Sequence, residues 1–158
     1  MMRAMMIAGL AAVAVGCGGG GGNDDTIAAS DWTAKVEQMC RKKAADTQSK
    51  VAELKKESRS QEEYVAKVLE YGSDSTKPVI DKVADMPAPK GKEQQAKDFV
   101  ASMNRLLPMV DDLADAVRDN DEAKGRALTS KMQAETDKAR GAARELGIDA
   151  CIPDSGTG

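Results

Sequence analysis

The chain has 158 residues, a formal net charge of −3, no histidine and only 3% aromatic residues. A mildly acidic chain has no long-range attraction to nucleic acid or anionic lipid, and so few aromatic rings offer little surface for stacking on bases. The commonest general base and metal ligand is also missing, because there is no histidine. Composition therefore argues against a nucleic-acid-binding protein and against histidine-based catalysis.

An export signal is predicted over residues 1–16. Arg3 gives the start of the chain a positive charge, an apolar run follows from Met5 to Val15, and small residues surround its end before Cys17. These features are typical of a secretory signal, and the run is shorter than the ~20 residues that cross a bilayer as a helix. The alternatives are an ordinary cleaved signal with a spare cysteine and an uncleaved apolar helix.

The residues around Cys17 resemble the lipobox of bacterial lipoproteins, in which a small residue precedes a cysteine that receives diacylglycerol and becomes the new N-terminus. Gly16 and Cys17 match this pattern, whereas Ala14 stands where a branched apolar residue is more usual. The resemblance implies an extracytoplasmic protein held on the bacterial cell membrane by lipid on Cys17, since two or more acyl chains anchor a protein stably. A flexible glycine-rich linker is expected to complete residues 17–30.

An all-α, up-down-up-down four-helix bundle is predicted for residues 31–152, because apolar residues recur there at steps of three and four. Helices of similar length joined by short turns alternate in direction. The expected helices run from Trp32 to about Ser58, from Ser60 to about Met86, from Lys90 or Glu93 to Arg118, and from Asn120 to Leu146. The expected cap residues are Ser30 or Asp31, Ser60 and Asn120 at helix starts, and Gly147 at the end of the last helix.

Two prolines, Pro78 and Pro108, fall inside the second and third helices. Each should kink its helix, although a break near Pro78 is the alternative, and each should free a carbonyl, at Asp74 and Asn104 respectively. Such carbonyls could orient a small polar ligand between helices. Water or a nearby hydroxyl such as that of Ser75 could satisfy them instead.

Cys40 and Cys151 remain once Cys17 is assigned to lipid, and an even pair in an oxidising compartment predicts a disulfide. The bundle topology agrees, because the fourth helix should end beside the start of the first and the tail can span the remaining distance. Two buried free thiols are the alternative. Residues 153–158 are expected to form a loose tail.

Charged residues gather in two places on the predicted helices, an aspartate row and a basic face. Asp111, Asp115 and Asp119 recur every four residues and could hold a divalent cation, although a solvated acidic face is the simpler interpretation. The basic face of the first helix is also read as solvated, with contact to lipid phosphates or to an acidic partner as the alternative. Its members are Arg41, Lys42, Lys43, Lys50, Lys55 and Lys56.

The chain resembles a loose group of small secreted actinobacterial lipoproteins, which share a lipobox, a linker and three further features. These are an aromatic residue before a cysteine in the first helix (Trp32, Cys40), a proline-rich turn (Pro87, Pro89) and a Leu-Gly ending before a last cysteine (Leu146, Gly147, Cys151). The resemblance implies export and a helical fold and carries over no functional residue.

No catalytic motif and no cofactor motif occurs in the sequence. We therefore expect a non-enzymatic interaction or envelope-associated module, anchored to the membrane through Cys17 and with an envelope protein as a further partner. The alternative is a protein that binds a small ligand in the bundle interior or a divalent cation on the Asp111, Asp115 and Asp119 row.

Overall fold

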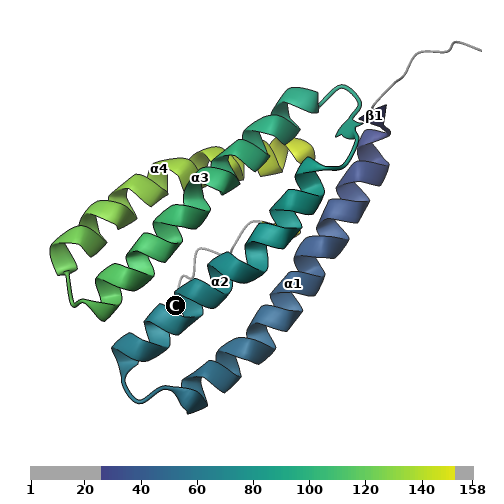
Figure 1. Ribbon diagram of the computed structural model, residues 1–158. Coiled ribbons are helices and arrows are strands. Elements are labelled where there is room, and N and C mark those ends of the chain that lie inside the picture. The colour runs from purple at the N-terminus through teal and green to yellow at the C-terminus, as the bar shows by residue number, and fades with distance from the viewer. Residues whose placement is uncertain (1–25, 152–158) are drawn as a thin grey trace, which may run out of the picture.

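The computed structural model describes residues 26–151, which fold into a four-helix bundle (Figure 1). The predicted all-α, up-down-up-down architecture is confirmed. No helix in this part of the chain is long and apolar enough to cross a membrane. The predicted signal (1–16), the lipidated Cys17 and the tail (153–158) lie outside the described residues. The elements are β1 (Thr26–Ile27), α1 (Ala29–Glu57), α2 (Gln61–Ala84), β2 (Ala88–Pro89), α3 (Glu93–Arg118), α4 (Glu122–Leu146) and the 3-10 turn η1 (Asp149–Cys151).

The linker was expected to extend to residue 30, but residues 26–30 are already part of the folded domain. β1 pairs in parallel with β2, and the Lys90 amide donates to the Ile27 carbonyl at 2.9 Å. The proline-rich turn between α2 and α3 thus supplies an extended segment to which the incoming chain binds. This pairing fixes where α1 begins.

The predicted N-cap of α1 is wrong for the same reason. The helix starts at Ala29, so Ser30 and Asp31 lie inside its first turn, and Ala28 occupies the cap position without a side-chain hydrogen bond. The Ala28 carbonyl instead accepts from the Trp32 amide at 3.0 Å. Strand pairing immediately before α1 therefore replaces a side-chain cap.

The start of α2 was predicted correctly and the start of α4 was not. The Glu63 amide donates to the Ser60 hydroxyl at 3.1 Å, as in a capping box. Asn120 does not cap α4: it adopts a left-handed conformation with φ of 53°. Asp121 caps instead, accepting from the Lys124 amide at 2.9 Å. Asparagine tolerates left-handed backbone well, so it makes the turn and leaves the cap to the next residue.

The end of α4 follows the predicted pattern. Gly147 has a φ of 74°, and its amide donates to the Arg144 carbonyl at 3.1 Å. The Ile148 amide donates to the Ala143 carbonyl at 3.0 Å, and the Ile148 side chain is fully buried. This Schellman arrangement turns the chain back toward α1.

Both internal prolines lie within continuous helices, so α2 does not break at Pro78 and α3 does not break at Pro108. The hydroxyls near Pro78 bond to a different carbonyl from the one expected. Ser75 and Thr76 both donate to the Gly72 carbonyl, at 3.4 and 2.6 Å. The expectation that the Ser75 hydroxyl bonds to the Asp74 carbonyl is therefore wrong.

The best-packed core lies at the end of the bundle where α1 and α3 begin and α2 and α4 end. All four helices contribute to this cluster. Away from it, α1 packs against α2, α2 against α3 and α3 against α4, whereas α1 and α4 do not pack along their lengths (Figure 1). The buried cluster comprises Trp32, Val36, Ile80, Val83, Ala96, Phe99, Ala143, Leu146 and Ile148.

Candidate functional site

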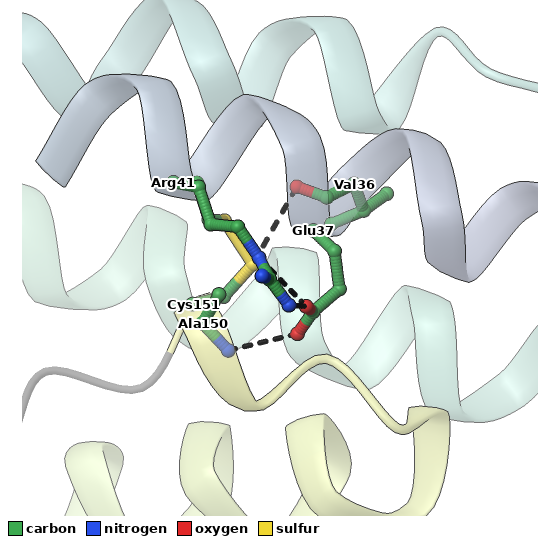
Figure 2. Close-up of a disulfide and its surroundings, with 6 residues drawn as sticks. Val36, Glu37, Arg41, Ala150 and Cys151 are labelled. Atoms are coloured by element: carbon green, nitrogen blue, oxygen red, sulfur yellow. Dashed lines mark hydrogen bonds and ion pairs between the residues drawn. A yellow bond between two sulfur atoms is a disulfide. The ribbon is translucent and has the colours of Figure 1, made fainter. Parts of the chain in front are cut away.

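A disulfide joins Cys40 of α1 to Cys151 of η1, with an S–S distance of 2.02 Å and a Cα–Cα distance of 5.1 Å (Figure 2). The predicted pairing is confirmed, and the alternative of two free thiols is not found. Because η1 directly follows α4, the bond fastens the end of the last helix to the first. It is a structural cross-link beside the buried core.

Polar contacts reinforce this junction, as Figure 2 shows for η1 and the facing turn of α1. The Ala150 amide donates to the Glu37 carboxylate at 2.8 Å, and Arg41 forms an ion pair with the same carboxylate. The hydrogen bond from Ala150 and then that from Arg41 lower the pKa of Glu37, which is 16% exposed. The Thr33 hydroxyl also donates to the Leu146 carbonyl at 2.9 Å. The start of α1 is thus held to the end of α4 by covalent and polar bonds together.

A cavity of about 320 Å³ lies between the helices, next to the disulfide. Cys151 forms part of its wall, and α2, α3 and α4 supply nearly all the rest. Lys43 is the one cavity residue that comes from α1. The apolar wall is formed by Val68 and Leu69 of α2, by Phe99, Met103, Leu106, Leu107 and Val110 of α3, and by Met132, Ala139 and Ala143 of α4.

Small side chains leave room in the cavity wall. A Cβ atom added to Gly72 of α2 would have no neighbour within 4 Å, and Ala139 of α4 presents only a methyl group. Ala44 of α1 is exposed, and α1 does not pack along α4. Helix α4 therefore packs closely against α3, whereas it leaves room toward α1.

Two of the three hydroxyl side chains in the described cavity wall donate to backbone carbonyls, and the third is that of Thr136. Ser73 donates to the Leu107 carbonyl at 3.4 Å and Thr76 to the Gly72 carbonyl. Among residues 26–151, no buried side-chain nitrogen or oxygen lacks a hydrogen-bond partner. The wall is therefore mainly apolar, and the Thr136 hydroxyl is the wall hydroxyl of the described residues that does not donate to the backbone.

Two cations supply the charge of the cavity. Lys43 is half-buried, and this burial lowers the pKa of its ammonium group. The side chain of Arg140, on α4, is 21% exposed, and none of the described residues that line the cavity is an aspartate or a glutamate. The prediction that Lys43 belongs to a solvated basic face is thus wrong for this residue, although Arg41, Lys42, Lys55 and Lys56 are exposed as expected.

The predicted aspartate row is only partly assembled into one place. Asp111 and Asp115 share a shallow depression with Glu70 and Asp74 of α2, whereas Asp119 lies beyond it at the C-cap of α3. Within residues 26–151, no group of three or more histidine, cysteine, aspartate or glutamate side chains is arranged to hold a metal ion. Arg118 forms ion pairs with both Glu70 and Asp115, so part of the negative charge is already neutralised.

Sequence reasoning did not find the cavity or its two cations. Met103 and Met132 line the cavity, and Met103 also packs against the core together with Met86. The available signal was the run of small residues at Thr136, Ala139 and Ala143, which could have indicated a gap as well as a close contact. Comparisons with protein-family models, with curated proteins and with solved structures find no match to this chain.

Proposed function

We propose that this protein is a lipid-anchored, extracytoplasmic binding protein that holds a small, mainly apolar ligand in the cavity between its helices and catalyses no reaction. The observation that carries the proposal is the cavity of about 320 Å³ with apolar walls from three helices. Ligand sites in proteins are concave, mostly apolar and about 300–1,000 Å³ in volume. A bound apolar group would be removed from water there, which is favourable by roughly 25 cal/mol per Å².

The location at the bacterial cell membrane rests on the lipobox-like residues that end at Cys17 and on the resemblance to actinobacterial lipoproteins. The disulfide supports an oxidising compartment, because such bonds are rare in reducing cytosol. Replacing Cys17 with serine should release the protein from the membrane or leave its signal uncleaved. A Cys17→Ser chain that remains membrane-attached and mature would contradict the lipid anchor, and fractionation with mass measurement distinguishes these outcomes.

Binding can be tested with two C12 probes, dodecanoate and dodecan-1-ol, by isothermal titration calorimetry on the full chain with Cys17→Ser. The proposal predicts saturable binding of at least one probe with one site per chain. Binding of neither probe would refute it. A ligand that binds the folded state also raises the unfolding temperature, which gives an independent readout.

Gly72 offers a variant that fills the cavity without strain. A Cβ at this position meets no atom within 4 Å, so Gly72→Leu places its side chain in the cavity and should abolish binding. Gly141→Leu is the matched control, because Gly141 is also helical with open space around an added Cβ but does not line the cavity. Equal loss of binding in both variants would argue against the cavity as the site.

A second candidate, an interaction or envelope-associated module, is favoured by the exposed basic residues Lys42, Lys55 and Lys56 of α1. An acidic partner would be recognised through this face. Pull-down from membranes with the wild-type chain and with a Lys42→Glu, Lys55→Glu, Lys56→Glu variant tests it. A partner retained equally by both would exclude this face.

A further inference from the structure

We propose that the cavity ligand is an anionic amphiphile, a long-chain fatty carboxylate whose head group lies between Lys43 of α1 and Arg140 of α4. This inference rests on the proposed function and adds the chemical class of the ligand. It follows from the charge of the cavity, from the partners of the two cations and from the shape of the apolar wall.

The charge distribution is one-sided. Among residues 26–151, Lys43 and Arg140 are the two ionisable side chains that line the cavity apart from the bonded Cys151, and both are cationic. They come from α1 and α4, two helices that do not pack along each other (Figure 1), and both line the same cavity. A ligand that enters this cavity with an anionic end would contact both cations.

Neither cation is fully engaged by the protein. Lys43 has no carboxylate partner within residues 26–151, and its hydrogen bond is a long one of 3.4 Å to the hydroxyl of Thr47, one turn further along α1. Its partial burial is therefore not balanced by an opposite charge, which is the situation that lowers the pKa of a lysine. A ligand carboxylate would restore that balance.

Arg140 has donors to spare for the same group. Its contact with Asp137 is 3.4 Å and uses one terminal nitrogen of the guanidinium. A guanidinium carries five N–H donors in a planar fork that suits a carboxylate. Because Arg140 makes only this weak contact on α4, most of its N–H donors are available to a ligand in the cavity.

The wall favours an alkyl chain over a flat aromatic ligand. Phe99 is the one aromatic residue in it, and the other apolar contacts are aliphatic or come from Met103 and Met132. Methionine is flexible and adapts to irregular shapes, as a bent chain requires. The wall hydroxyls of Ser73 and Thr76 already bond to backbone carbonyls, so a neutral head group would find mainly the Thr136 hydroxyl, whereas a carboxylate would find two cations.

The experiment compares dodecanoate with dodecan-1-ol, which have the same chain length and differ in head-group charge. Calorimetric titrations use the full Cys17→Ser chain with dodecanoate below its critical micelle concentration. We expect dodecanoate to bind at least about tenfold more tightly than dodecan-1-ol, which corresponds to about 1.4 kcal/mol. Lys43→Met and Arg140→Met should each weaken dodecanoate binding by about tenfold and leave dodecan-1-ol binding unchanged.

Matched controls come from neighbouring cations outside the cavity. Lys42→Met on α1 and Arg144→Met on α4 remove exposed charges of the same type and should leave both affinities unchanged. Equal affinity for the two probes, or equal effects of cavity and control variants, would overturn the carboxylate assignment while the apolar cavity remained supported. Binding of neither probe would refute the proposed function itself. Dimerisation in sedimentation that Gly72→Leu abolishes would identify a second copy of the chain as the occupant and overturn the inference.

Discussion

Removal of the cross-link, by Cys40→Ala together with Cys151→Ala, should cost a large share of the stability of the domain. The two cysteines are 111 residues apart in the sequence. Constraining a loop of that length removes chain entropy from the unfolded state worth about 4.8 kcal/mol at 25 °C. Domains of this size have total stabilities of about 5–15 kcal/mol. The variant is therefore expected to lose a third or more of its free energy of unfolding.

The loss should arise mainly in the unfolded state, because η1 keeps other bonds to α1. Glu37 still accepts from the Ala150 amide, and Ile148 remains buried in the core. The folded variant should consequently retain its helical circular dichroism spectrum at low denaturant. A changed spectrum under these conditions would show that the disulfide is needed to form the fold and not only to stabilise it.

Urea unfolding followed by circular dichroism measures the effect, in a Cys17→Ser background so that no third cysteine interferes. The parent chain treated with a reductant provides the matched control and should unfold with the same midpoint as the double variant. A loss of less than about 1 kcal/mol would refute the loop-entropy reasoning. Different midpoints for the reduced parent and the variant would indicate that the alanines themselves disturb the core.

Four further outcomes follow from single-residue substitutions, each measured by urea unfolding. Gly147→Ala should lower the free energy of unfolding by about 1–2 kcal/mol, because Gly147 has a φ of 74° that alanine adopts poorly. Gly141→Ala should raise it by about 0.5–1 kcal/mol, because Gly141 lies inside α4 with open space around an added Cβ. Trp32→Ala should cost about 3–5 kcal/mol, since Trp32 is 1% exposed within the core. The lowered pKa of Glu37 stabilises the folded state above the usual glutamate pKa of about 4.3, and this contribution is lost as the pH falls through the lower folded value. Glu37→Gln should therefore lose stability at pH 7 and show a smaller further loss between pH 5 and 3 than the parent.

The helical architecture could be predicted because the apolar periodicity is strong and the turns are marked. Ser60 and Gly147 carry out the roles that local chemistry assigns to them, and Cys40 pairs with Cys151 because the topology brings the end of α4 to the start of α1. These features depend on short-range rules or on connectivity. Each of these features can be predicted from the sequence without knowing how the side chains pack.

The start of α1 and the cavity could not be predicted because they depend on contacts distant in sequence. Ala28 becomes the cap position because Ile27 pairs with Pro89, more than sixty residues later in the chain. Lys42 and Lys43 are neighbours in one basic run, yet Lys42 is exposed and Lys43 is half-buried in the cavity wall, because only Lys43 lies on the side of α1 that borders the cavity. Small side chains such as Ala139 permit both a close contact and a gap.

The cross-link and the cavity are parts of one arrangement. Cys151 belongs to the cavity wall, and Cys40 lies one helical turn before Lys43 on α1. Closely packed interiors leave few voids larger than a water molecule, so a cavity of about 320 Å³ is a notable feature of this bundle. The disulfide and the polar bonds beside it join α1 to the end of α4 at the core, whereas the two helices do not pack on each other farther along. The cross-link therefore closes one end of the arrangement whose middle contains the cavity.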